Sequence, residues 1–233
     1  MNSRLLEIKN NLEIVQGRIA DACRESNRKE SEITLIAVTK TYPASDIDLL
    51  KQLGIDNVGE NRDQEASVKQ KEVKEKYNWH FIGQLQSNKA KSVVQYAHLI
   101  HSVDRWSLAK EIQKSAQSID KKQPVLIQVD LDQSGPDPTR GGIWPAELME
   151  LASLISNASH LELKGLMSVA PLGENPTQAF ERLAQIRVEF LKIYDQATIL
   201  SAGMSHDLEA AILCGATHLR IGSALLGERP KIG

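Results

Sequence analysis

Short apolar, β-branched segments alternate with longer amphipathic ones along the whole chain. The clearest short segment covers residues 33–39, Ile-Thr-Leu-Ile-Ala-Val-Thr, which carries no charge and is typical of a strand buried on both faces. Helices of roughly 10–15 residues between such segments predict parallel βαβ units. The predicted strands are 33–39, 57–60, 79–83, 99–104, 124–131, 161–169, 198–204 and 218–225.

The amphipathic stretches supply the helices. Leu5, Ile8, Leu12, Val15 and Ile19 recur in steps of three and four, which places them on one helical face. The charged run 69–76 is predicted to be a solvated helix face. Further helices are predicted at 44–53, 62–76, 87–97, 106–118, 145–156, 176–194 and 205–214.

This alternation predicts a (β/α)8 barrel, a TIM barrel in one domain spanning residues 1–233. The length of 233 residues is slightly below the roughly 250 typical of that fold. An open, doubly wound sheet is the alternative, but it often has a glycine-rich first turn, and here that turn reads Lys40-Thr41-Tyr42-Pro43. The turn-rich segment 132–142 follows the fifth strand and is expected at the C-terminal face of the barrel.

The composition argues against several classes of protein. The 28 basic and 30 acidic residues nearly balance, whereas nucleic-acid binders normally carry a basic excess. No stretch approaches the roughly 20 apolar residues of a membrane span, and the N-terminal segment does not resemble a signal peptide. The two cysteines, Cys23 and Cys214, make no disulfide framework and indicate a reducing compartment. We expect a cytoplasmic protein that binds neither nucleic acid nor membrane.

Lys40 is the most suggestive candidate for chemistry. In barrels of this type the active site lies at the C-terminal ends of the strands, and Lys40 directly follows an apolar strand. Apolar surroundings favour the neutral amine that Schiff-base chemistry requires. A strand-end lysine that reaches solvent is the alternative. Lys164 is a second candidate, as in class I aldolases; simple alternation places it on the face of Glu162 and Leu166, with Met167 opposite.

The last two predicted strands end in groups that suit an anion. One ends in residues 201–205, Ser-Ala-Gly-Met-Ser, with Ser205 as the expected N-cap of the next helix, and the other contains residues 220–223, Arg-Ile-Gly-Ser. Barrels frequently bind phosphate in this region, although an ordinary cap and a turn glycine explain each feature alone. Combined with an amine nucleophile at Lys40, the pattern predicts a site for pyridoxal 5′-phosphate (PLP).

No metal site is predicted. His98 and His101 are three residues apart on or beside a strand, so they are expected to point to opposite faces. Neither cysteine lies near a histidine with the spacing of zinc ligands.

At these residues the chain resembles the YggS/PROSC family of PLP homeostasis proteins. The most specific matching block is 79–89, Trp-His-Phe-Ile-Gly-Gln-Leu-Gln-Ser-Asn-Lys. The other matching segments are 37–40, 59–61 with 64–65, 165–167, 200–205 with 207 and 210–212, and 220–222. The resemblance implies an alanine racemase N-terminal-like barrel, PLP fold type III, with PLP held as an internal aldimine by Lys40.

The resemblance also implies roles for individual residues. The phosphate would be bound by Ser201, Ser205 and the backbone of Gly222 and Ser223, with Arg220 facing the pyridine nitrogen. The residues implied to line the rest of the cofactor pocket are Asn61, His80, Ser102, Met167 and Met204.

Members of this family bind PLP without established turnover and are implicated in vitamin B6 and amino-acid homeostasis. We therefore expect a non-catalytic, monomeric PLP-binding protein whose partners include PLP-dependent apoenzymes or regulators. A small PLP-dependent racemase is the alternative; it requires an acid/base partner for Lys40, and Tyr42 is the tyrosine beside the expected site. A PLP-independent Schiff-base aldolase is a third hypothesis.

Overall fold

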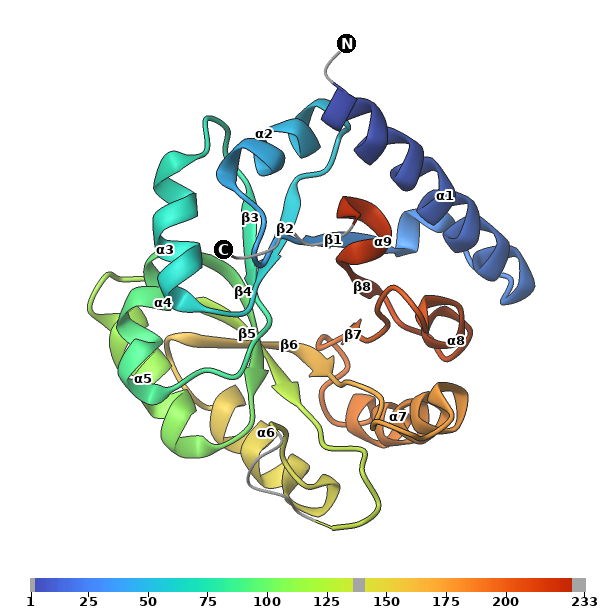
Figure 1. Cartoon of the computed structure of the whole chain (residues 1–233). Coiled ribbons are helices and arrows are strands. Elements are labelled where there is room, and N and C mark those ends of the chain that lie inside the picture. The colour runs from blue at the N-terminus through green and yellow to red at the C-terminus, as the bar shows by residue number, and fades with distance from the viewer. Residues whose placement is uncertain (1–2, 136–140, 228–233) are drawn as a thin grey trace.

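Eight parallel strands close into a barrel in the computed structural model, which describes residues 3–135 and 141–227. The strands follow one another around the barrel in chain order, and β8 pairs with β1 (Figure 1). The predicted (β/α)8 fold is therefore confirmed. The strands are β1 Thr34–Val38, β2 Asn57–Glu60, β3 Asn78–Phe81, β4 Ala97–Val103, β5 Gln123–Gln128, β6 Leu161–Met167, β7 Ile199–Ser201 and β8 His218–Ile221.

Helices surround the strands on the outside of the barrel (Figure 1). They are α1 Ser3–Glu25, α2 Ala44–Gln52, α3 Asp63–Glu72, α4 Ala90–Tyr96, α5 Trp106–Gln117, α6 Leu148–Ser156, α7 Pro176–Leu191, α8 Leu208–Leu213 and α9 Ser223–Leu226, with short 3-10 turns at Glu30–Glu32, Ser87–Lys89 and Pro145–Glu147. Residues 136–140 of the loop expected at the C-terminal face lie outside the described residues.

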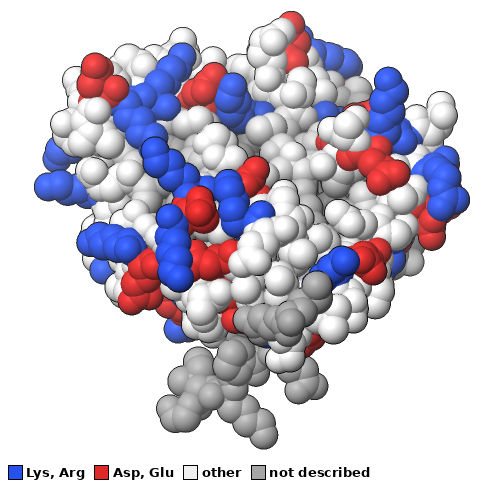
Figure 2. Space-filling view, turned by 90° about the horizontal axis from the view of Figure 1, so that it is seen from above, with Lys and Arg blue, Asp and Glu red and all other residues white. Residues whose placement is uncertain are grey.

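The outer core lies between the helices and the outward faces of the strands. In α1 the predicted apolar stripe is buried at Ile8, Leu12, Val15 and Ile19. In the described part of the chain, no helix combines the length and apolar character needed to span a membrane. On the face that Figure 2 presents, Lys and Arg are interspersed with Asp and Glu, in keeping with the formal charge of −2.

The last two strands end earlier than the sequence predicted. β7 stops at Ser201 rather than 204, and β8 stops at Ile221, after which Ser223–Leu226 forms α9 rather than strand. Gly203 has a φ of +90°, and a Cβ there would lie 2.7 Å from the Cβ of Ala211. This conformation turns the chain out of the strand. The expected N-cap at Ser205 was wrong, because Asp207 precedes the first residue of α8.

A bulge in β6 reverses the alternation expected around Lys164. Val125 pairs with Leu163 and Leu126 pairs with Gly165, so Lys164 is an extra residue in the ladder. Met167 therefore packs inside the barrel with Leu99 and Leu126, and Lys164 lines a hollow at the N-terminal end of the same interior. The expectation that these two side chains take opposite faces was wrong. Lys164 forms an ion pair of 2.7 Å with Glu162, at the mouth away from Lys40.

Gly165 makes this bulge possible, and we predict that Gly165→Ala destabilises the fold. Gly165 has a φ of +146°, and an added Cβ would lie 1.9 Å from the carbonyl oxygen of Ile199. Strain and forced displacement of β7 should reduce the free energy of unfolding by about 3 kcal/mol. Urea denaturation measures the change. Gly17→Ala in α1 is the matched control: it meets no atom within 4 Å and should stabilise the helix by about 0.5–1 kcal/mol.

Candidate functional site

The C-terminal mouth of the barrel gathers most of the residues expected at the site. Lys40 lies two residues after β1 and Asn61 directly follows β2, while Ser102 and Met167 are buried at the ends of β4 and β6. β7 and β8, with the loops that follow them, contribute Ser201, Met204, Ser205, Arg220, Gly222 and Ser223. In a parallel barrel all these strand ends lie at one rim.

The backbone around Lys40 is held from behind by α3. Lys69 donates a hydrogen bond of 2.8 Å to the carbonyl of Thr39, and Glu65 accepts one of 2.9 Å from the amide of Thr41. These two α3 residues also form an ion pair with each other at 3.2 Å. Thr41 has a φ of +71°, which is rare for a β-branched residue and indicates backbone strain. Lys40 thus lies between two anchored neighbours.

Glu60 completes this arrangement on the outer side of β2. Its Oε1 accepts hydrogen bonds from Lys69 at 2.8 Å and from the Thr39 hydroxyl at 2.7 Å. Burial raises the pKa of the Glu60 carboxyl, and the Lys69 ammonium opposes that shift. For Glu65, burial alone would raise the pKa, but the Thr41 amide and Lys69 lower it overall. The anchor therefore depends on one buried ammonium between two carboxylates.

We predict that Lys69→Met loosens this anchor and destabilises the fold by about 3–5 kcal/mol at pH 8, because the buried Glu60 carboxylate loses its cation. The pKa of Glu60, already raised in the folded state, rises further. The loss is therefore smaller at pH 5, where Glu60 takes up a proton, and grows as the pH rises through its folded pKa. Denaturation curves at both values measure this dependence.

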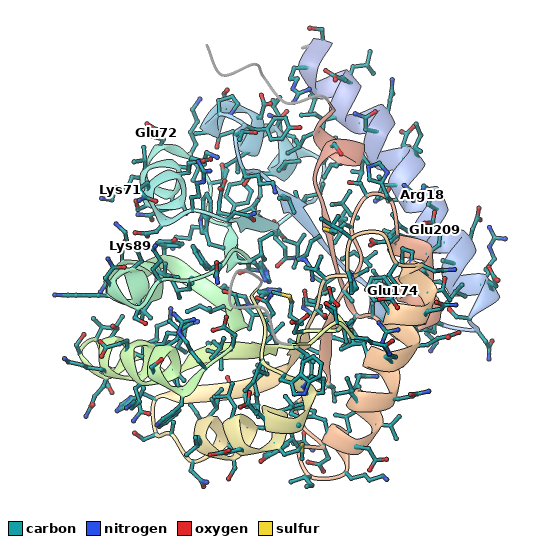
Figure 3. The ribbon with its side chains drawn as sticks, turned by 60° about the horizontal axis from the view of Figure 1, so that its bottom comes forward. Arg18, Lys71, Glu72, Lys89, Glu174 and Glu209 are labelled. Atoms are coloured by element: carbon teal, nitrogen blue, oxygen red, sulfur yellow. The ribbon has the colours of Figure 1, made fainter. Side chains whose placement is uncertain are left out.

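Lys71→Met is the matched control for that experiment. Lys71 lies on the same helix and is exposed, pointing outward in Figure 3, so its removal should change stability by less than about 0.5 kcal/mol. The double substitution Lys69→Met with Glu60→Gln should recover part of the stability. Equal destabilisation of Lys69→Met at the two pH values would contradict the assigned role of Glu60.

The loops after β7 and β8 meet at Ser205. Its Oγ accepts a hydrogen bond of 3.3 Å from the amide of Ala224 in α9, and a hydroxyl that accepts can still donate its own hydrogen to a ligand. In the same loop the amide of Met204 donates to Asp207 at 2.5 Å. Together these groups form a two-part cradle that comprises residues 203–205 and 222–224.

Helix α1 holds both parts of this cradle. Arg18 donates to the carbonyl of Ser205 at 2.9 Å and binds Glu209 of α8 through two hydrogen bonds of 2.6 and 2.8 Å (Figure 3). Asn11 donates to the carbonyl of Leu225 at 3.1 Å. Arg4 donates to the carbonyl of Leu226 at 2.8 Å. The position of the cradle is thus set by side chains from the other end of the sequence.

Arg220 lies inside the barrel, 4% exposed. It donates to Ser201 Oγ at 2.8 Å and to the carbonyl of Ser168 at 2.8 Å. Burial lowers the pKa of Arg220 to about 10, and Asp207 opposes this shift; the guanidinium therefore stays charged at neutral pH. Two acidic residues of the loop and helix after β7 are hydrogen-bonded to other groups, Asp207 to the Met204 amide and Glu209 to Arg18.

His80 lies deeper in the barrel than the other expected site residues. It hydrogen-bonds to Asn57 at 3.1 Å and to His101 at 2.9 Å. The rings of His98 and His101 both contact His80, with centroids 5.6 and 5.1 Å away. The expectation that His98 and His101 point to opposite faces was wrong, because the pairing of β4 shifts register next to β3 and β5. Among the described residues, no cluster of three metal-ligating side chains is arranged to hold an ion.

Three buried oxygens near the C-terminal mouth fit a polar ligand. Within residues 3–135 and 141–227, Oδ1 of Asn61, Oγ of Ser102 and Oγ1 of Thr41 are buried and have no hydrogen-bond partner. A buried polar atom without a partner costs roughly 1–3 kcal/mol, so such atoms point to a ligand that pairs with them. A ligand that carries polar groups of its own suits these atoms.

Sequence reasoning missed the residues that position the site. Lys69 was predicted to lie on a solvated face, but it is only 8% exposed. Its spacing of four residues from Glu65 could have indicated an ion pair along the helix. Its contact with Glu60 gave no such signal, because Glu60 lies on a separate element. Arg18 gave no local signal, because its partners Ser205 and Glu209 are distant in sequence.

The chain matches the family described as "Alanine racemase, N-terminal domain" over residues 8–230. An alanine racemase of Clostridium difficile has the same fold, with a TM-score of 0.72 at 17% identity, covering 97% of this chain and 58% of that one. The family resemblance described in the sequence analysis implies a barrel of this class, which is called PLP fold type III.

Similarity to one group within the class is much closer. The pyridoxal phosphate homeostasis protein of Corynebacterium glutamicum is 40% identical over 223 residues, 93% of this chain and 99% of that protein. That of Aquifex aeolicus is 41% identical over 217 residues, 91% and 94% of the two chains. PipY of Synechococcus elongatus, solved with PLP bound, is 33% identical with a TM-score of 0.79 and covers 91% of this chain and 100% of that one. The chain therefore belongs to the pyridoxal phosphate homeostasis proteins.

Proposed function

We propose that this protein binds PLP at the C-terminal mouth of its barrel, holds it as a Schiff base on Lys40, and acts in PLP homeostasis. The observation that carries the proposal is the juxtaposition of Lys40 after β1 with the cradle after β7 and β8, since β1 and β8 are paired neighbours. The names of the relatives and the PLP-bound PipY structure support the same ligand. The recipients of the cofactor in this role are PLP-dependent apoenzymes or their regulators.

Each group of residues has a distinct task in this proposal. The Ser205 hydroxyl and the backbone of Gly222 and Ser223 bind the phosphate, while Arg220 donates a hydrogen bond to the pyridine nitrogen. We assign Ser201 a supporting role, because its hydroxyl is engaged with Arg220 and His101. The residues that line the remaining wall are Asn61, Ser102, Met167 and Met204.

The same geometry supports a carrier rather than a catalyst. PLP supplies a ring that withdraws electrons, most strongly when its nitrogen is protonated. A guanidinium only donates hydrogen bonds, so Arg220 favours the unprotonated ring nitrogen. Tyr42, the candidate acid/base partner of Lys40, is 2% exposed and donates its hydroxyl to the carbonyl of Gly227 at 2.7 Å. It is therefore engaged with the backbone.

The Schiff base is tested by the absorption of the purified protein incubated with PLP. We expect visible absorption that Lys40→Ala abolishes without loss of the fold, because the amine that binds the aldehyde is removed. Borohydride reduction followed by peptide mapping should place the cofactor on Lys40. Lys164→Ala is the matched control, since Lys164 lies at the opposite mouth and pairs with Glu162.

Mapping of the reduced cofactor to Lys164 would overturn the assignment and favour the aldolase hypothesis. The same preparation tests the absence of turnover. Amino acids incubated with it in deuterated water should exchange their α-hydrogen no faster than with free PLP. Clearly faster exchange would show a racemase-type activity.

We predict that Ser205→Ala weakens PLP binding by about one order of magnitude, because a charge-assisted hydrogen bond is worth roughly 1.5–3 kcal/mol. Titration followed by absorption measures the affinity. Pyridoxal, which lacks the phosphate, should bind poorly to the unmodified protein. Ser153→Ala, on the exposed side of α6, is the control and should bind PLP normally. Equal affinity for pyridoxal and PLP would refute the phosphate cradle.

A further inference from the structure

A chain of hydrogen bonds crosses the interior of the barrel and ends at Arg220. Its links are Asn57 Oδ1 to His80 Nε2 at 3.1 Å, His80 Nδ1 to His101 Nε2 at 2.9 Å, His101 Nδ1 to Ser201 Oγ at 2.9 Å, and Ser201 Oγ to Arg220 Nη1 at 2.8 Å. The five residues come from β2, β3, β4, β7 and β8, so the chain joins opposite walls.

The Arg220 end fixes the direction of the first link and leaves a hydroxyl hydrogen for the second. A guanidinium has donors and no acceptor, so Arg220 donates to Ser201 Oγ. The Ser201 hydroxyl keeps one hydrogen, and His101 Nδ1 lies within hydrogen-bond distance of it. When the hydroxyl donates that hydrogen to His101 Nδ1, the ring hydrogen of His101 lies on Nε2.

The Asn57 end fixes the same direction independently. With the Asn57 amide placed so that Oδ1 accepts from Nδ2 of Asn78 at 3.1 Å, the same oxygen accepts from His80 Nε2. His80 then carries its hydrogen on Nε2 and accepts at Nδ1. Nε2 of His101 then donates its hydrogen to Nδ1 of His80. The two ends agree, and each group donates toward its neighbour without conflict.

This arrangement requires both histidines to be neutral. An imidazolium donates from both nitrogens, so a proton on His80 would place two hydrogens in the link to His101. Burial lowers the pKa of His80 to about 3, with smaller effects from His218 and His98. Burial also lowers the pKa of His101, helped by His80 and Arg220. The Asn57 end of the hydrogen-bond chain borders a hollow of about 490 Å³. The hollow is also lined by His98, His218, Glu162 and Lys164.

We propose that His80 and His101 are positioning residues that set the orientation of Arg220 toward the cofactor ring through the Ser201 hydroxyl. Because His101 Nδ1 accepts a hydrogen bond from the Ser201 hydroxyl, a lone pair of the Ser201 oxygen faces the guanidinium. The carbonyl of Ser168 holds the second nitrogen at 2.8 Å, so the guanidinium is fixed at two points. Successive hydrogen bonds polarise one another, which strengthens each link.

The role of Arg220 at the cofactor ring rests on the proposed function, but the hydrogen-bond chain itself is tested without PLP. In protein labelled with ¹⁵N and free of cofactor, nuclear magnetic resonance should show His80 and His101 neutral, each with its hydrogen on Nε2, between pH 6 and pH 9. We expect His101→Leu to speed solvent exchange of the Arg220 guanidinium hydrogens about tenfold, as the loss of one net hydrogen bond allows. His101→Asn supplies an acceptor for Ser201 and should keep exchange near the original rate.

His160→Gln is the control, because His160 lies in the turn before β6, outside the chain of hydrogen bonds, and should leave Arg220 unchanged. A hydrogen on Nδ1 of either histidine, or unchanged Arg220 exchange in His101→Leu, would overturn the proposal. Should His101→Leu fail to fold, the histidine tautomers in the unmodified protein still decide it. With PLP added, His101→Leu should shift the absorption maximum and His101→Asn should restore it. If the unmodified protein takes up no PLP, the proposed function fails, while the cofactor-free readouts still decide the hydrogen-bond chain.

Discussion

The pairing of β8 with β1 is the constraint on which the rest of the molecule depends. It joins Thr34 to His218 and Ile36 to Arg220 in register, which places the first and last strands side by side. Lys40 follows one of these strands and the cradle follows the other, so closure of the barrel assembles the site. An open parallel sheet with the same strand order would leave β1 and β8 at opposite edges, with these groups far apart.

Several polar side chains inside the barrel are hydrogen-bonded to one another. Arg220, Ser201, His101 and His80 occupy positions that apolar side chains fill in many barrels. Polar groups buried in this way stabilise only when each has a partner, because a partial network costs more than an apolar core. The apolar cluster of Leu99, Leu126 and Met167 is small by comparison. Much of the packing energy therefore lies outside the strands, beneath the helices.

Most of the architecture was predictable from local pattern, and the resemblance named the candidate site residues, most of which the fold brings to one mouth of the barrel. Apolar β-branched runs such as 33–39 located the strands, since parallel strands are buried on both faces. The errors arose where one residue changes the local geometry. Gly165 accommodates a bulge that puts Lys164 and Met167 on the same face of β6, and Gly203 ends β7 early. Contacts between separate elements, such as Lys69 with Glu60, depend on tertiary packing that no local spacing reveals.

The contacts of helix α1 determine when, during synthesis, the C-terminal mouth of the barrel can form. This helix packs against α8 and α9 (Figure 1). Arg18 holds the Ser205 carbonyl of the cradle, and Arg4 and Asn11 hold carbonyls of α9, which begins in the cradle. Because α1 leaves the ribosome before α8 and α9, it buries the face that packs against them only after those two helices have been made. During synthesis α1 stays exposed until the C-terminal quarter emerges. The cradle forms in that same step, so the proposed PLP site is complete only after the barrel has closed.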